Sequence, residues 1–281
     1  MQELLTENFV VVDGVRVHFG KAGSGPALVL VHGLVGSVGN WRRNIVELAE
    51  DATVYAVDLT NMGRSERVKG LDASLAATAD RLAAFMEALG LDKADISGHS
   101  HGGAVAMMFA ARHPERVRSL ILFAPANPFC DFGHFLVRFY QTRTGKALAR
   151  MVPYLPKQLH ALSLRRMYGD PLRVTDGSLE GYTDGLRVPG TMEHILRIVG
   201  SWFEDMRLLQ GELERIAMTP TLLVWGDRDR AVGLRSAEFL QEILQRSRLV
   251  VVPGAGHIPF EEMPEECNRA VHGWLSGAVS A

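Results

Sequence analysis

Short runs of apolar residues alternate along the chain with longer segments in which apolar residues recur with the period of a helix. Uninterrupted apolar runs of about four to eight residues are typical of strands buried on both faces. We expect strands over residues 10–12, 15–19, 27–31, 53–57, 94–97, 119–123, 221–225 and 249–252. We expect helices over residues 41–49, 74–89, 102–112, 236–244 and 264–274. Alternation of this kind predicts an α/β fold with a mostly parallel sheet covered by helices on both faces.

One stretch, residues 126–211, breaks the alternation, because it has helical pattern but no convincing strand. It is interpreted as a helical insertion after the sixth strand. Its first helix carries Phe129, Phe132, Phe135 and Phe139 at spacings of three and four, which places them on one face. Two interpretations stay open: the face lines an apolar substrate pocket, or it packs within the insertion itself.

Composition and charge narrow the function classes. The chain has 281 residues, of which 47% are hydrophobic and 22% charged, as in a globular protein of one large or two ordinary domains. Lys plus Arg number 30 and Asp plus Glu number 32, a net charge of -2. That balance offers no overall basic field for nucleic acid or anionic lipid, so a small-molecule substrate is favoured over a nucleic-acid partner.

The sequence lacks the patterns that indicate disulfides, metal sites, secretion or membrane insertion. Cys130 and Cys267 form no CxxC pair, so neither a disulfide framework nor a thiolate zinc site is expected. The first residues have no basic and apolar signal-peptide regions, and the longest apolar run, residues 104–111, is too short to span a bilayer. We therefore expect a cytoplasmic protein without integral membrane association. No cofactor and no metal are expected, and the oligomeric state is left open.

The strongest chemical signal is Gly98-His99-Ser100-His101-Gly102, between an expected strand and an expected helix. This G-x-S-x-G pattern in a strand-turn-helix context holds a serine in strained backbone at a helix N-terminus. The alternative is an ordinary glycine-rich turn with a capping serine. A serine hydroxyl needs a base and an acid that orients the base before it can act as a nucleophile.

Candidates for the base and the acid follow the last two expected strands. His257 comes after residues 249–252 through a glycine-rich loop, and Asp227 and Asp229 come after residues 221–225. The carboxyl ends of parallel strands meet at one edge of the sheet, where ligands bind. The chain order Ser, Asp, His is that of α/β hydrolases.

On these motifs, together with His32-Gly33, the run from Asp58 to Ser65 and Gly254 to Pro259, the sequence resembles the α/β-hydrolase superfamily. It is similar to single-domain, cap-bearing serine esterases. The resemblance implies an eight-stranded, mostly parallel sheet, with residues 1–125 and 212–281 as the core and a helical cap over residues 126–211.

The same resemblance implies roles for individual residues. Ser100 is the nucleophile, His257 the base and Asp229, rather than Asp227, the acid. The backbone N–H groups of Leu34 and His101 form the oxyanion hole. Where the family often has glycine in the loop after the fourth strand, this chain has Asn61, a residue that tolerates left-handed backbone.

The expected activity is hydrolysis of a carboxylic ester, or a related acyl bond, of a small apolar substrate through an acyl-enzyme. Two alternatives remain: a C–C bond hydrolase of ring-cleavage diketones, and a ligand-binding receptor on the same fold with little turnover. A dinucleotide loop is disfavoured because Gly20, Gly23 and Gly25 precede a strand. A metal at His99 and His101 is disfavoured because no third ligand accompanies them.

Overall fold

The computed structural model describes residues 5–130 and 133–277. Eight strands form one sheet in the order β1-β2-β4-β3-β5-β6-β7-β8. Their bounds are Thr6–Val12 (β1), Val15–Ala22 (β2), Ala27–Val31 (β3), Thr53–Val57 (β4), Ala94–His99 (β5), Val117–Phe123 (β6), Thr221–Gly226 (β7) and Ser247–Val252 (β8). All eight expected strands are present, with ends that differ by a few residues.

The sheet is antiparallel at one edge and parallel elsewhere. β1 and β2 form a hairpin through Asp13 and Gly14, which take positive φ values of 49° and 81° as such a tight turn requires. β2 also pairs antiparallel with β4. From β4 to β8 every neighbouring pair is parallel. The expected mostly parallel sheet is confirmed.

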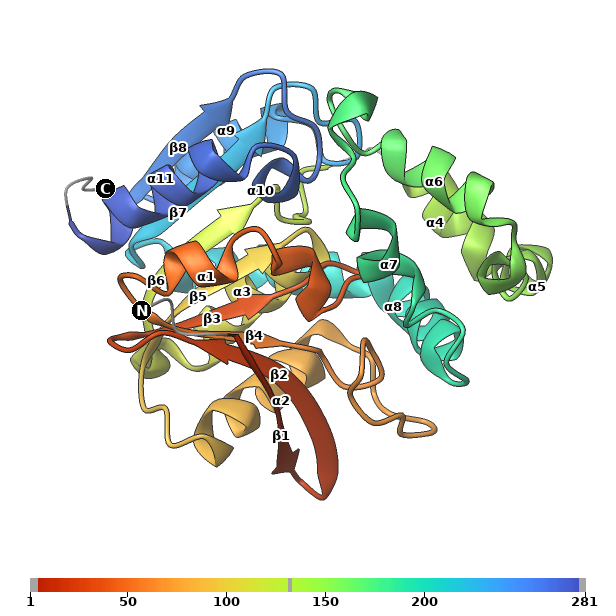
Figure 1. The fold of residues 1–281 in the computed structure, drawn as a ribbon, viewed down its shortest axis with the longest axis horizontal. Coiled ribbons are helices and arrows are strands. Elements are labelled where there is room, and N and C mark those ends of the chain that lie inside the picture. The colour runs from red at the N-terminus through yellow and green to blue at the C-terminus, as the bar shows by residue number, and fades with distance from the viewer. Residues whose placement is uncertain (1–4, 131–132, 278–281) are drawn as a thin grey trace.

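Helices cover both faces of the sheet (Figure 1). Outside the segment between β6 and β7 they are η1 (Val38–Trp41), α1 (Ile45–Leu48), α2 (Leu75–Ala88), α3 (His101–Arg112), η2 (Pro114–Arg116), α9 (Arg235–Ile243), α10 (Pro259–Glu262) and α11 (Pro264–Leu275). Buried residues of α2, α3 and α9 form one core, and buried residues of α1, α10 and α11 belong to the other.

The strands supply both cores by simple alternation. In β3, Val29 and Val31 join the first core while Leu28 and Leu30 join the second. Because successive side chains point to opposite faces, a strand covered on both sides must be apolar at every position. This explains why the buried strands appear in the sequence as unbroken apolar runs.

One expected helix differs from the structure. Residues 41–49 are not continuous: η1 ends at Trp41 and α1 begins at Ile45. Asn44 lies between them with its side chain turned to other elements, donating to the carbonyl oxygen of Phe260 and to Oδ1 of Asn268. These tertiary hydrogen bonds replace a helical turn that local pattern alone would favour.

The segment between β6 and β7 is helical and contains no strand within its described residues. Its elements are α4 (His134–Gln141), α5 (Arg143–Ala149), η3 (Val152–Tyr154), α6 (Lys157–Arg165), η4 (Pro171–Arg173), α7 (Ser178–Thr183), α8 (Thr191–Glu212) and η5 (Leu213–Ile216). Figure 1 shows α4, α5 and α6 together, to the right of the sheet. Of the helices in the described residues, none combines the length and the apolar character that crossing a membrane requires.

Three backbones meet where β5 turns into α3. A Cβ at Gly102 would lie 2.3 Å from the carbonyl oxygen of His32 and 2.5 Å from that of Val31. A Cβ at Gly98 would lie 2.3 Å from the carbonyl oxygen of Gly102 itself. Only glycine allows α3 to approach β3 this closely.

We predict that Gly102→Ala lowers the free energy of unfolding by about 3 kcal/mol, because the backbone itself must shift to admit the methyl group. Urea denaturation measures the change. Gly200→Ala in α8 is the matched control, since nothing lies within 4 Å of the position that its methyl group would take. The Gly200→Ala substitution should raise the free energy of unfolding by about 0.5–1 kcal/mol, because alanine is favoured over glycine inside a helix. A Gly102→Ala variant as stable as the parent chain would contradict this account.

Candidate active site

Ser100 occupies the turn between β5 and α3 in strained backbone. Its φ is 51° and its ψ is -120°, values that a residue with a side chain rarely adopts. The Ser100 N–H donates to the carbonyl oxygen of Phe123, which holds the turn against β6. The side chain is partly exposed at the N-terminus of α3, where developing negative charge is favoured.

His257 and Asp229 are hydrogen-bonded to each other at the ends of β8 and β7. The distance from His257 Nδ1 to Asp229 Oδ2 is 2.9 Å, and the carboxylate is fully buried. Asp229 Oδ1 accepts from the N–H groups of Ala231 and Val232 at 2.7 and 2.9 Å. Because a carboxylate only accepts, Nδ1 carries the proton, and in the neutral ring Nε2 is then unprotonated.

Asp227, the other candidate acid, lies elsewhere. Its Oδ1 accepts from the N–H of Gly254 at 2.6 Å, so it caps the loop that leads from β8 to His257. Ser100 and His257 line the same cavity. The structure therefore brings Ser100, His257 and Asp229 together at one edge of the sheet and places Asp227 outside this group.

His99 supports the backbone at His257. Its Nε2–H donates to the carbonyl oxygen of His257 at 2.9 Å, and the two rings lie 4.8 Å apart between centroids. Burial holds the pKa of His99 well below its usual value, and the nearby His257 lowers the pKa further. His99 is thus a neutral donor that positions the loop.

The loop after β3 lies beside Ser100. The Gly36 N–H donates to the Gly33 carbonyl oxygen and so forms a turn. Leu34, within this turn, lines the same cavity as Ser100. His32 orders this loop: its Nδ1–H donates to the Gly33 carbonyl oxygen at 2.7 Å, and its Nε2 accepts from Leu59 N–H at 3.1 Å. Burial lowers the pKa of His32, in agreement with this neutral state.

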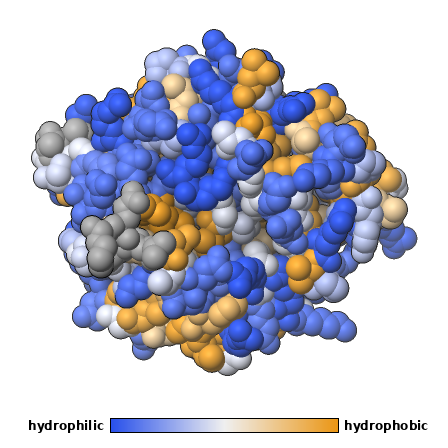
Figure 2. Space-filling model, in the orientation of Figure 1, coloured by the Kyte–Doolittle hydropathy of each residue, from blue (hydrophilic) through white to orange (hydrophobic). Residues whose placement is uncertain are grey.

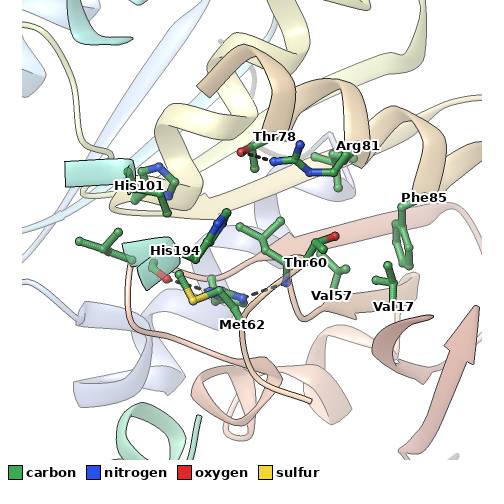
Figure 3. A pocket seen from close by; sticks show the side chains of 15 residues that line it. Val17, Val57, Thr60, Met62, Thr78, Arg81, Phe85, His101 and His194 are labelled. Atoms are coloured by element: carbon green, nitrogen blue, oxygen red, sulfur yellow. Dashed lines mark hydrogen bonds between the residues drawn. The ribbon is translucent and has the colours of Figure 1, made fainter. Parts of the chain in front are cut away.

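The backbone of His101 begins α3, whereas its ring lines a separate small cavity. As the first residue of α3, it has no preceding helical turn whose carbonyl could accept its N–H. Its ring lies in a small cavity of about 20 Å³, room for about one water, together with His194 and Arg81 (Figure 3). Burial lowers the pKa of His101 to about 3 and that of His194 to about 4, so both rings are neutral near pH 7.

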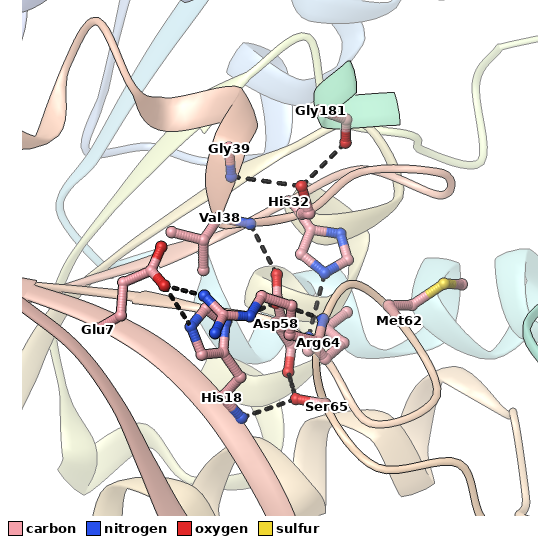
Figure 4. Close-up of polar contacts among 12 residues, drawn as sticks. Glu7, His18, His32, Val38, Gly39, Asp58, Met62, Arg64, Ser65 and Gly181 are labelled. Carbon is pink, nitrogen blue, oxygen red and sulfur yellow. Dashed lines mark hydrogen bonds and ion pairs between the residues drawn. The ribbon is translucent and has the colours of Figure 1, made fainter. Parts of the chain in front are cut away.

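Asp58 ties the loop after β4 to its neighbours (Figure 4). Its Oδ1 accepts from Val38 N–H at 2.7 Å, and its Oδ2 accepts from Arg64 N–H at 2.8 Å and from His18 Nδ1–H at 2.7 Å. Asn61 in this loop has a φ of 69°. The expected left-handed backbone at Asn61 is confirmed.

Glu262 joins the His257 loop to the inserted helices, and the sequence patterns did not single it out. Its side chain is fully buried and accepts from the N–H groups of Gly256 at 2.7 Å, Gly169 at 3.0 Å and Asp170 at 2.8 Å. The N–H of His257 also donates to the carbonyl oxygen of Met167 at 2.7 Å. The available signal was the pair of glutamates, Glu261 and Glu262, within the otherwise apolar residues 258–264.

The cavity at Ser100 has a volume of about 510 Å³ and walls that are mostly aliphatic. Most of the described residues that line it come from the segment between β6 and β7: Tyr140, Val152, Leu155, Leu159, His160, Ser163, Leu164, Met167, Leu179, Tyr182, Thr183 and Leu186. No Lys or Arg is among the described residues that line it.

The described phenylalanines that were predicted to line the substrate pocket do not line the cavity at Ser100. Phe129 packs against Phe239 with ring centroids 5.6 Å apart, and Phe135 is 80% exposed. Phe139 contacts the Tyr140 ring, and Phe132 lies outside the described residues. None of the three described phenylalanines lines the cavity, whereas Tyr140 does. The prediction of one helical face that carries these phenylalanines is wrong, because α4 begins at His134 and Phe129 lies in a turn before it.

No cluster of three or more His, Cys, Asp or Glu side chains in residues 5–130 and 133–277 is arranged to hold a metal ion. His99 and His101 point to different partners, the His257 backbone and the small cavity respectively.

Comparison with known proteins adds a family match and similar chains. A family model described as the alpha/beta hydrolase fold matches residues 26–264. An uncharacterised protein of Mycobacterium tuberculosis is 30% identical over 272 residues, which cover 92% of this chain and 78% of the other. The 2-hydroxy-6-oxo-2,4-heptadienoate hydrolase of Pseudomonas putida is 27% identical over 279 residues, 95% of each chain. The crystal structure of a bacterial membrane phospholipase A is 28% identical with a TM-score of 0.80, covering 97% of this chain and 86% of that one.

The buried neutral histidines predict an acid-sensitive fold. Between about pH 7 and pH 5, histidines of the unfolded chain take up protons, whereas His101 and His194, with pKa values of about 3 and 4, do not. The unfolded state then binds more protons than the folded state. The contribution of these two histidines to the free energy of unfolding is therefore full above about pH 6.5 and is lost as the pH falls, by up to about 1.4 kcal/mol per histidine and pH unit. Urea denaturation across this range measures the slope. His101→Gln should reduce the slope of the free energy of unfolding against pH. An unchanged slope would contradict the neutral state of the buried His101 ring.

We predict that Glu262→Gln lowers the free energy of unfolding by about 2–4 kcal/mol, because the new amide group turns a donor toward buried N–H groups. Displacement of the His257 loop should also reduce kcat in any assay of turnover. Glu265→Gln is the matched control, since that side chain is 66% exposed and should change stability by less than about 0.5 kcal/mol. Equal effects of the two substitutions would contradict the clamping role of Glu262.

Proposed function

The chain belongs to the alpha/beta hydrolase fold family, and from that premise we propose that it is a serine hydrolase. Its substrate is a carboxylic ester of a small, largely apolar molecule, cleaved through an acyl-enzyme. The observation that carries the proposal is the placement of Ser100, in strained backbone, on the same cavity as the hydrogen-bonded pair His257–Asp229.

The proposed cycle begins when Ser100 Oγ attacks the substrate carbonyl carbon while His257 Nε2 takes the hydroxyl proton. Asp229 holds the ring and favours its protonated form. The negative oxygen of the tetrahedral intermediate accepts from the N–H groups of Leu34 and His101. Collapse breaks the ester C–O bond, and the leaving alcohol takes the proton from His257. Water activated by His257 then releases the acid and restores Ser100.

Residues 1–125 and 212–281 would form the catalytic core and residues 126–211 a cap that determines substrate choice. Support comes from the cavity walls, most of which belong to residues between β6 and β7. Aliphatic walls without Lys or Arg among the described lining residues favour an uncharged acyl group. A volume of about 510 Å³ is in the range of small-molecule sites.

C–C bond hydrolysis is the second candidate, because the similar Pseudomonas putida protein is named as a hydrolase of a dienoate. Such a substrate carries a carboxylate, whose burial without a cationic partner is costly. The absence of Lys and Arg from the described cavity walls therefore favours the ester. Relative kcat/KM on a short p-nitrophenyl ester and on a vinylogous diketone distinguishes the two, since a strong preference for the diketone would select the second.

We predict that Ser100→Ala and His257→Ala each lower kcat on p-nitrophenyl esters by up to about 10⁶-fold, because each removes a member of one catalytic unit. Asp229→Asn should cost up to about 10⁴-fold, since it disturbs the tautomer of His257. Asp227→Asn is the matched control two residues away, and its effect should be much smaller.

A fluorophosphonate should label the folded protein at Ser100, as mass spectrometry of peptides would show. Folded protein that takes no label would overturn the enzyme proposal in favour of a ligand-binding role. If Asp227→Asn were more damaging than Asp229→Asn, the assigned acid would be wrong.

A further inference from the structure

The segment from α4 through α6 exposes eight large apolar side chains. Phe135 is 80% exposed and Tyr154 is 72% exposed. Others in the same segment that are exposed are Leu136, Leu148, Met151, Leu155, Leu159 and Leu162. Figure 2 shows hydrophobic residues beside hydrophilic ones over the right side of the molecule, where Figure 1 places these helices. We call this set of residues the apolar patch; exposed sets of this size mark interaction surfaces.

Basic residues are interspersed with the apolar patch along the chain, and acidic residues are absent from the same segment. From His134 to Arg166 the chain has no Asp or Glu, although its net charge as a whole is -2. The basic residues are Arg138, Arg143, Lys146, Arg150, Lys157, Arg165 and Arg166. Glu193 pairs with Arg150 and Glu180 with Lys157. The other five are in no ion pair found among the described residues.

The apolar patch is continuous with the cavity at Ser100. Leu155 and Leu159 are 37% and 46% exposed, and both also line that cavity. An apolar chain could therefore pass from the outer surface of these helices to the cavity along aliphatic side chains. A patch that served only to bind another protein would have no need of this connection.

We propose that α4–α6 dock on an anionic lipid surface, from which an ester with a long apolar chain enters the cavity. Apolar side chains interleaved with Lys and Arg are what such a surface binds. A second copy of the chain is a poorer occupant, because two copies of this patch would bring like charges together. The docking stands by itself, whereas the delivery of an ester rests on the proposed function. The net charge of -2 describes the whole chain and does not exclude a local excess of basic residues in this segment.

Flotation with vesicles tests the docking directly. The full-length protein should float with vesicles of phosphatidylcholine mixed with phosphatidylglycerol and much less with vesicles of phosphatidylcholine alone. Binding should weaken as salt is added, because salt screens charges at the protein surface. Each basic residue near the membrane accounts for about fivefold in affinity.

Two variants separate the charge contribution from the apolar one, and neither changes a cavity-lining residue. Arg165→Glu with Arg166→Glu should weaken binding to anionic vesicles by about 20-fold or more. Phe135→Ser with Leu162→Ser should weaken binding at both low and high salt. Arg246→Glu with Arg248→Glu, two exposed basic residues at the β8 end of the sheet, is the matched control and should bind as the parent chain does.

The outcomes distinguish docking from catalysis. Ser100→Ala should still bind vesicles, so docking is tested even if Ser100 is not the nucleophile. The Arg165→Glu, Arg166→Glu variant should retain hydrolysis of a soluble short ester and lose it on a long-chain ester presented in anionic vesicles. Failure to bind any vesicle, or binding that ignores lipid charge and both variants, would overturn the proposal. Concentration-dependent dimers that Leu162→Ser abolishes would overturn it in favour of a second copy.

Discussion

The close approach of backbones at the turn between β5 and α3 is the constraint on which the candidate site depends. Gly102 lies against the His32 carbonyl, so the start of α3 and the loop after β3 are held side by side. The same tight turn places Ser100 in left-handed backbone, at a free-energy cost that the surrounding sheet must sustain. Strain at Ser100 and proximity to Leu34 are thus two results of one packing contact. A looser turn would relieve the strain and also separate these groups.

Buried carboxylates hold the remaining loops in place. Asp58, Asp229 and Glu262 each accept from two or more N–H groups, which stabilise the charged form of a carboxylate inside a protein. The nearby histidines are held in the neutral form instead, because burial lowers the pKa of His32 and of His99. Neutral imidazoles can donate from one nitrogen and leave the other to accept. The loops are therefore ordered by directional hydrogen bonds to their own backbone.

The inserted helices differ from the rest of the molecule in charge and in exposure. The segment between β6 and β7 contributes most of the cavity walls, and its part from α4 to α6 carries both the apolar patch and a run without acidic residues. Glu262 fastens this segment to the loop that bears His257. Any movement of the inserted helices is thus coupled to the position of His257. Substrate access and the geometry of the proposed base are linked through the Glu262 side chain and through the hydrogen bond from the His257 N–H to the Met167 carbonyl oxygen.

The sequence by itself determined the eight strands, the order of the elements and the glycine-rich turn at Ser100, because these depend on local pattern and on the steric needs of a few residues. It also brought His257 and Asp229 into consideration, since the carboxyl ends of parallel strands must meet. The resemblance favoured Asp229 over Asp227 as the acid, but only the tertiary structure gives the partners: Asp229 reaches His257, whereas Asp227 accepts from the Gly254 N–H. Likewise, the spacing of Phe129, Phe135 and Phe139 predicted one apolar helix face, but Phe129 packs on Phe239 before α4 begins and Phe135 is exposed. Which surface a face meets depends on residues far along the chain, and no local pattern contains that information.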